Sequence, residues 1–103
     1  MTLDQVQENV DEFVTAHGGY WDEFQILARL TEELGEVASA LQRNAGLRPR
    51  KVEVDLEGEV GDLLFTIAAF ANKTGIRLDE AMVKVMAKYQ ERDSKAWQDA
   101  AKP

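Results

Sequence analysis

The sequence predicts an all-α fold in which a single domain, residues 1–103, forms a subunit of four helices. Apolar residues recur three and four positions apart in four segments, whereas no segment shows a convincing strand pattern. Glycines and capping residues separate these segments. A chain of 103 residues buries only a modest core, so association between subunits is expected to add to its stability.

The first predicted helix begins after Thr2 and ends at Gly18 and Gly19. Thr2 and Gln5 have the spacing of a capping box, and glycines commonly end helices. Its apolar face consists of Leu3, Val6, Val10, Phe13 and Val14.

The second predicted helix begins after Asp22, a plausible N-cap, and runs to residue 44 or 45, with Gly46 as its stop. A basic loop with Pro49 follows it. Its apolar stripe consists of Ile26, Leu27, Leu30, Leu34, Val37 and Leu41.

The third predicted helix spans residues 52–74, with Gly75 just past its end. One apolar stripe lies on one side, and further apolar residues lie on the opposite side. Three other short helices cannot cover both sides, so we expect a subunit interface, most simply that of a two-fold homodimer. The stripe is Leu56, Val60, Leu63, Ile67 and Phe70, and the opposite side holds Val54, Phe65 and Ala69.

The fourth predicted helix begins near Asp79, taken as its N-cap, and runs into the region of Trp97. Its apolar face consists of Met82, Val85, Met86 and Tyr89.

Composition narrows the classes of function. The formal net charge of −7 argues against a nucleic-acid polymer or an anionic membrane as the partner. No cysteine is present, so disulfides and thiolate sites are excluded. The sequence shows neither a signal-peptide pattern nor an apolar run as long as a membrane span. We therefore expect a cytoplasmic protein.

Two pairs of acids stand out, Glu33 with Glu36 and Glu59 with Asp62. Each pair has i, i+3 spacing, which places both carboxylates on one face of a helix. In both helices the pair stands in the same relation to the apolar stripe: the first acid lies about 80° from its centre and the second about 140° from it. Antiparallel packing of the two helices would bring the four carboxylates together, where Mg²⁺, or Mn²⁺ in its place, would offset their repulsion. The simpler alternative is four solvated surface acids.

Four further interpretations concern other polar and aromatic residues of the chain. Lys88 and Arg92, one helical turn apart, either hold phosphate oxygens or form surface ion pairs. Trp21 either stacks on a nucleobase or packs against the start of a helix. Arg29 is interpreted as a surface partner of the neighbouring acids. His17 lies at the end of the first predicted helix, where its charge suits the helix dipole.

Three motifs resemble those of the MazG-like nucleotide pyrophosphohydrolases, an all-α group that includes dimeric dUTPases. They are Glu-Glu-Leu-Gly-Glu at residues 32–36, Glu-Val-Gly-Asp at 59–62 and Lys-Tyr-Gln-Glu-Arg at 88–92. The likeness extends from about residue 21 to residue 92. It implies a helical subunit in a dimer or a dimer of dimers, and Mg²⁺-dependent cleavage of a nucleoside triphosphate to a monophosphate and pyrophosphate. A house-cleaning role, removing non-standard or surplus nucleotides, is also implied.

The resemblance also implies roles for individual residues. Glu32 and Glu33 are assigned to catalysis, with Glu32 orienting or deprotonating the attacking water. Lys88 and Arg92 would neutralise phosphate charge. The implied metal ligands are Glu33, Glu36, Glu59 and Asp62.

The chain departs from the family pattern at three places. Gly58 stands where a second acid often precedes Glu59, Met86 stands where asparagine is common, and no lysine lies near Asp55. These changes leave the four acids intact and affect the expected base and sugar contacts.

Two other functions compete with hydrolysis. One is a non-catalytic helical dimer that acts as a protein-interaction module, with the acids as solubilising charge. The other is a di-iron carboxylate bundle, which usually needs Glu-x-x-His motifs, whereas the only histidine is His17.

Overall fold

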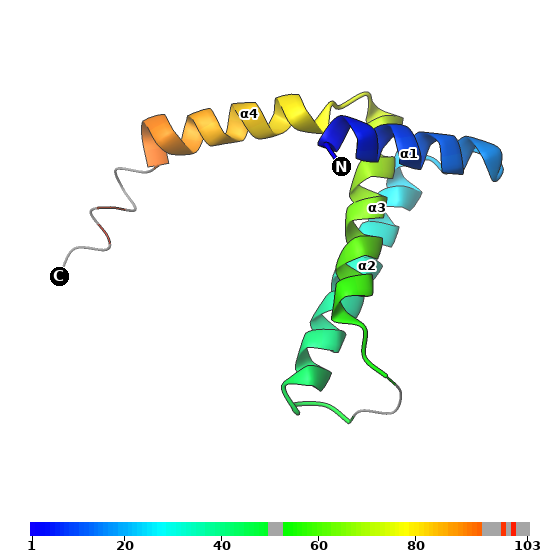
Figure 1. The fold of residues 1–103 in the computed structure, drawn as a ribbon, viewed down its shortest axis with the longest axis vertical. Coiled ribbons are helices and arrows are strands. Elements are labelled where there is room, and N and C mark those ends of the chain that lie inside the picture. Colours follow the sequence, from blue (N-terminus) through cyan, green and yellow to red (C-terminus); the bar gives the residue numbers. More distant parts are fainter. Residues whose placement is uncertain (50–52, 94–97, 99, 101–103) are drawn as a thin grey trace.

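The computed structural model describes residues 1–49, 53–93, 98 and 100. Four α-helices form the described chain, and a short π-helical turn, η1 (Tyr89–Asp93), continues the last of them (Figure 1). No strand occurs in these residues, so the predicted all-α class is confirmed. The helices are α1 (Leu3–Ala16), α2 (Glu23–Asn44), α3 (Leu56–Thr74) and α4 (Leu78–Lys88).

The first two helices begin where their capping residues predict. The Thr2 side chain accepts the Gln5 backbone N–H at 3.1 Å, and the Gln5 side chain accepts the Thr2 N–H in return. Asp22 and Gln25 form the same reciprocal pair at the start of α2. Each box satisfies backbone donors that the helix itself leaves unpaired.

The predicted start of α3 at residue 52 is too early, although residues 50–52 lie outside the described chain. Residues 53–55 are not helical, and α3 begins at Leu56. Asp55 ends the non-helical stretch, because its carboxylate accepts the Gly58 N–H at 2.9 Å as an N-cap. At the other end, Gly75 adopts a left-handed conformation with φ 74°, which supports its predicted role as the stop.

The prediction that Asp79 caps α4 is wrong. The helix begins at Leu78, and the Asp79 carboxylate accepts the N–H of the next residue, Glu80. The Leu78 N–H instead donates to the side-chain oxygen of Gln7 at 2.9 Å, so the capping group comes from α1. The α-helix ends at Lys88, before the π-helical turn, and the predicted continuation to Trp97 falls outside the described residues.

The helices form an open, angular subunit. α2 and α3 run antiparallel side by side, α1 crosses one end of the pair, and α4 projects away from that end (Figure 1). The radius of gyration is 17.2 Å, whereas a compact domain of this length has about 13 Å. The fold therefore leaves long helical faces uncovered within one subunit.

The buried core differs from the predicted stripes. On α2 the buried positions are Ile26, Glu33 and Ala40, with half-buried Leu30 and Val37 between them, so the face packed on α3 includes an acid. On α3 the buried residues are small, and the large stripe residues are half-buried or exposed. The buried residues of α3 are Thr66, Ala68, Ala69 and Ala71.

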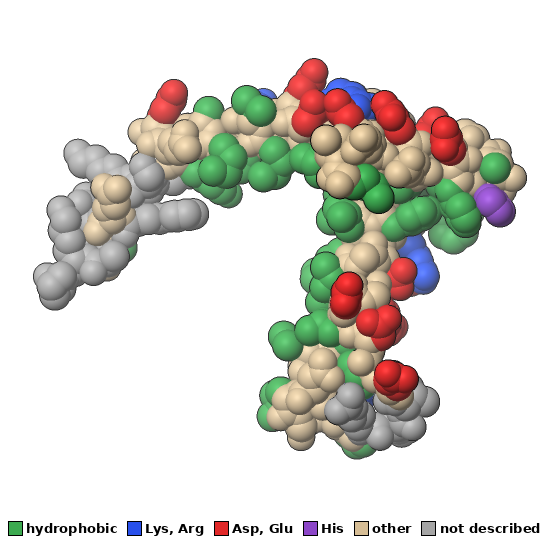
Figure 2. Space-filling view, in the orientation of Figure 1, with side chains coloured by type: hydrophobic (Ala, Val, Ile, Leu, Met, Phe, Trp, Pro, Cys, Tyr) green, Lys and Arg blue, Asp and Glu red, His purple; other side chains and the backbone are tan. Residues whose placement is uncertain are grey.

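Large apolar side chains remain exposed along α2, α3 and α4. In the space-filling view, hydrophobic side chains line the inner side of the angle between α4 and the α2–α3 pair (Figure 2). Several residues of the predicted apolar faces are therefore exposed: Phe13, Leu27, Leu34, Leu41, Val60, Met82 and Met86. Across the described chain, no helix has the length and apolar character to cross a bilayer.

Candidate metal and nucleotide site

Packing of α2 against α3 brings three of the four predicted metal ligands together. One carboxylate oxygen from each of Glu33, Glu59 and Asp62 lies within 4.8 Å of the other two. Glu33 is only 4% exposed, Glu59 is half-buried and Asp62 is exposed. We call these three residues the carboxylate triad. The triad arises because Glu33 occupies the same helical face as Ile26 and Ala40, which packs on α3.

Glu36, the fourth predicted ligand, is exposed and lies outside the triad. Its charge nevertheless acts on the site. The pKa of Glu59 is raised, first by partial burial and then by repulsion from Glu36, Asp62 and Glu33. The pKa of Glu59 thus reflects the burial of its carboxylate first and the crowding of negative charges around it second.

Arg29 partly compensates this charge. Its guanidinium contacts Glu33 at 2.7 Å and Glu32 at 2.9 Å, and these ion pairs raise the pKa of Arg29. Within the described chain no basic side chain forms an ion pair with Glu59 or Asp62. The open side of the triad therefore offers oxygen donors only, the ligand set that Mg²⁺ and Mn²⁺ prefer. The residues present fit a hard divalent cation.

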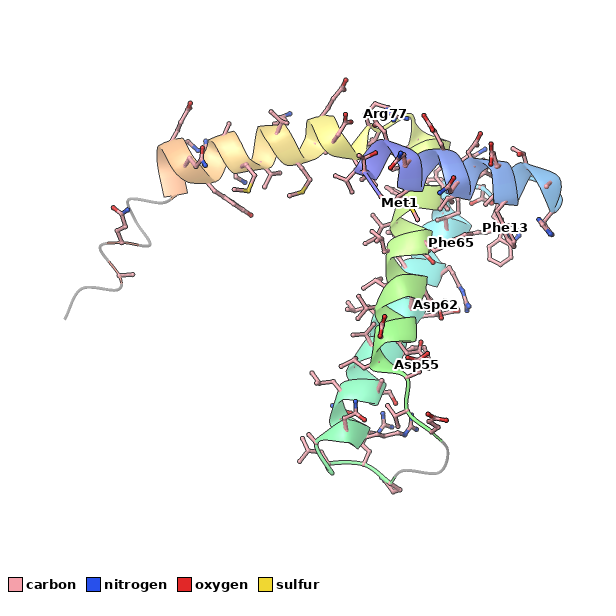
Figure 3. The ribbon with its side chains drawn as sticks, viewed as in Figure 1. Met1, Phe13, Asp55, Asp62, Phe65 and Arg77 are labelled. Carbon is pink, nitrogen blue, oxygen red and sulfur yellow. The ribbon has the colours of Figure 1, made fainter. Side chains whose placement is uncertain are left out.

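A cavity of about 350 Å³ opens beside the triad. Glu33, Asp62 and Arg29 line it together with aromatic side chains from α1, α3 and the α1–α2 loop and several smaller residues. Phe13 and His17 stack with ring centroids 4.1 Å apart, and Phe65 meets Phe13 edge-on at 5.8 Å. Figure 3 shows Phe13 and Phe65 close together, with Asp62 one turn away on α3. Carboxylates and aromatic rings thus share one cavity.

Two more residues of the loop between α1 and α2 line this cavity. Trp21 is one of them, and it is 60% exposed. The Tyr20 hydroxyl donates to Asp11 at 2.6 Å and accepts from Asn72 at 3.0 Å, which fixes its ring. Partial burial and the Asp11 hydrogen bond raise the pKa of Tyr20.

The sequence predicted Trp21 in this wall. It did not predict Phe13, which was expected on the apolar face of the first helix, or His17, which was placed at a helix end. The missing information is the crossing of α1 over the α2–α3 pair, which brings residues about fifty positions apart into contact.

Lys88 and Arg92 lie elsewhere. Lys88 is the last residue of α4, and Arg92 belongs to η1. Both elements project away from the α2–α3 pair, which carries the triad (Figure 1). The Lys88 ammonium lies over the ring of Tyr89 at 5.0 Å from its centroid. The chain by itself therefore does not bring these two basic residues to the triad, and their phosphate-binding role stays a prediction.

Comparison with known proteins gives a family for this fold and site. The model of the MazG nucleotide pyrophosphohydrolase domain matches residues 22–97. YpjD of Bacillus subtilis strain 168 is 38% identical over 100 residues, which cover 93% of this chain and 90% of YpjD.

Two solved structures resemble the subunit closely. The crystal structure of YpjD has a TM-score of 0.78 at 38% identity, covering 86% of this chain and 95% of that one. A MazG protein conserved in Bacillus, described as a nucleotide pyrophosphohydrolase, has a TM-score of 0.77 at 34% identity, covering 92% and 96%. The chain belongs to the MazG nucleotide pyrophosphohydrolase domain family. The resemblance recognised in its motifs is thereby confirmed.

Proposed function

We propose that the protein hydrolyses nucleoside triphosphates to nucleoside monophosphates and pyrophosphate with Mg²⁺. The observation that carries this proposal is the shared cavity, in which two acids of the carboxylate triad, Glu33 and Asp62, lie beside an aromatic wall. Such a cavity suits a ligand with a phosphate chain at one end and a flat base at the other. Membership of the MazG family supports the reaction class.

Glu33, Glu59 and Asp62 would hold the divalent cation, with Mn²⁺ as a substitute. Exposed Glu36 lies close enough to affect Glu59 and would join them after a change of side-chain conformation. When bound, the cation supplies Lewis-acid polarisation and neutralises phosphate charge.

Glu32 is the proposed group that orients or deprotonates the attacking water, with Glu33 beside it. Its carboxylate is exposed and bound to Arg29 at 2.9 Å, so it is held near the triad without being buried. The water oxygen bonds to phosphorus, the bridging P–O bond breaks and pyrophosphate leaves. Accepting the water proton is a role that an ionised carboxylate can fill.

The proposed assembly is a homodimer, or a dimer of dimers. Its support is the open subunit, with exposed apolar side chains on α2, α3 and α4. A second copy that covers these faces would bury apolar surface that water otherwise contacts. Because α4 projects from its own subunit, we propose that Lys88 and Arg92 neutralise phosphate charge in an assembled site.

The aromatic wall is the proposed base-binding region, and Trp21 is the proposed stacking residue. The wider role we propose is cytoplasmic house-cleaning, in which non-standard or surplus nucleotides are removed. Family membership supports this role more than any single contact does. A nucleic-acid polymer is not proposed as substrate, since the net charge of −7 opposes it.

The proposal is tested with a panel of standard and modified NTPs and dNTPs plus Mg²⁺, in which pyrophosphate and orthophosphate are both measured. We expect pyrophosphate from at least one nucleotide, and its loss in Glu36→Ala and Asp62→Ala without unfolding. Glu8→Ala is the control, because this exposed acid of α1 does not line the cavity. Retained activity in Asp62→Ala, or orthophosphate as the product, would contradict the proposal.

The competing function is a helical dimer that binds another protein, which the exposed apolar faces would also serve. It predicts no hydrolysis of any nucleotide and no thermal stabilisation by Mg²⁺. The same panel therefore separates the two.

A further inference from the structure

Arg29 occupies a particular place in the site. One nitrogen of its guanidinium lies 2.7 Å from Glu33, and the other terminal nitrogen lies 2.9 Å from Glu32. The Arg29 side chain is 51% exposed, whereas that of Glu33 is only 5% exposed. A single planar cation thus holds two neighbouring acids, one buried and one exposed.

The buried acid needs this partner in the metal-free protein. A carboxylate removed from water is costly unless a positive charge or hydrogen-bond donors accompany it. Only Arg29 forms an ion pair with Glu33 among the described residues, and it does so from the preceding turn of α2. The planar guanidinium suits this task because its nitrogens reach both acids at once.

A divalent cation bound to the triad would likewise compensate the negative charge of Glu33. The two cations repel each other at such short range, so binding of one weakens the contact of the other with Glu33. Arg29 can leave Glu33 without entering an apolar environment, because it lines the open cavity and still has Glu32 as partner.

We propose that Arg29 is a positioning residue that holds the buried Glu33 carboxylate in the metal-free protein and gives it up when the divalent cation binds. This inference rests on the proposed metal site, and it replaces the interpretation of Arg29 as a mere surface partner. It makes Arg29 a competitor of the metal. Removing Arg29 therefore destabilises the metal-free protein more than the Mg²⁺-loaded one, and it tightens Mg²⁺ binding.

The test compares wild type and Arg29→Gln by thermal unfolding in EDTA and in saturating Mg²⁺, at one protein concentration, and measures Mg²⁺ affinity by calorimetry. For Arg29→Gln we expect a larger fall in the melting temperature in EDTA than in Mg²⁺, and a dissociation constant for Mg²⁺ about tenfold lower than that of wild type. In free energy, a tenfold change is about the contribution of one charge-assisted hydrogen bond. In a Glu33→Gln background in EDTA, most of the effect of Arg29→Gln should disappear, because no buried charge is left to pair.

Arg77→Gln is the matched control. Arg77 forms an ion pair with Asp4, but both partners are exposed and neither lines the cavity beside the triad. Its loss should change the melting temperature equally with and without Mg²⁺. Should Arg29→Gln not fold, Arg29→Lys serves instead, since one ammonium cannot span both acids, and a smaller effect in the same direction is expected.

Two results would overturn the inference in different ways. An equal loss of stability in EDTA and in Mg²⁺, or weaker Mg²⁺ binding by Arg29→Gln, would refute the exchange at Glu33 and leave the metal site standing. Absence of any Mg²⁺ effect on the wild-type protein would remove the metal site, and this inference would fall with it.

Discussion

Gln7 links α1 to the start of α4, and its replacement by leucine tests how the projecting helix is held. The side chain is only 1% exposed and makes three hydrogen bonds. Its amide nitrogen donates to the side-chain oxygen of Asn72 at 3.0 Å and to the Ile76 carbonyl at 2.9 Å. Its oxygen accepts the Leu78 N–H at 2.9 Å. Leucine has a similar size but satisfies none of these groups.

The expected cost follows from the three groups that Gln7→Leu leaves without their partner. A buried polar group without a partner costs about 1–3 kcal/mol. The bonds are only partly buried, so we take the lower end for each group and expect a loss of about 3 kcal/mol in the free energy of unfolding. That is a large share of the stability of a small domain.

The assay is urea unfolding followed by circular dichroism, at a fixed protein concentration because assembly would contribute to stability. Gln42→Leu is the control, since this glutamine is exposed on α2 and its change should stay within about 0.5 kcal/mol. If Gln7→Leu lowered the free energy of unfolding by less than about 1 kcal/mol, these hydrogen bonds would not hold α4 in place, and the reasoning would be refuted.

Three other predictions follow from single contacts. A Cβ added at Gly58 would lie 2.2 Å from the Asp55 carboxylate, so Gly58→Ala should displace that N-cap. We expect the free energy of unfolding in urea to fall by about 1 kcal/mol, and an unchanged unfolding midpoint would contradict this. The pKa of Tyr20 is raised in the folded state, so protonated Tyr20 stabilises the fold below the unfolded value of 10.0, and this stabilisation is lost as pH rises through the folded value. NMR titration should show that Asp11→Asn lowers the pKa of Tyr20, and no change would refute the role of Asp11. Trp21→Ala should raise KM for the nucleotide substrate several-fold while kcat changes little, since stacking acts on binding; an unaltered KM would remove Trp21 from the site.

The helix starts show which parts of the fold the sequence could predict. The capping box of α1 and the Asp22 N-cap of α2 were predicted because each acts within four consecutive residues. The start of α4 was not, because its capping group comes from Gln7, 71 positions away from Leu78. A distant capping side chain leaves no local pattern, whereas Asp79 gave a misleading one.

The sequence predicted the helical period of the apolar stripes, but not whether each stripe is buried within the chain or exposed on its surface. Leu27, Leu34 and Leu41 repeat at helical spacing, and this periodicity cannot distinguish a core within one subunit from a surface that faces another. The buried positions of α2 and α3 instead include small residues such as Ala40 and Ala69, which carry a weak hydrophobic signal.

The candidate site was predicted better than the core. Spacing alone indicated that Glu33, Glu59 and Asp62 would converge, and the structure brings these three together. Spacing could not place Glu36 in solvent, because that depends on the rotation of each helix about its axis. Nor could it foresee the pairing of Arg29 with the buried acid.

Crystals of the protein soaked in Mn²⁺ would test the central claim most directly, because anomalous scattering locates the ion independently of any assay. The account predicts an anomalous peak bonded to carboxylate oxygens of Glu33, Glu59 and Asp62, and its absence in crystals of Asp62→Asn. An empty triad in wild-type crystals that hold Mn²⁺ elsewhere would contradict the account.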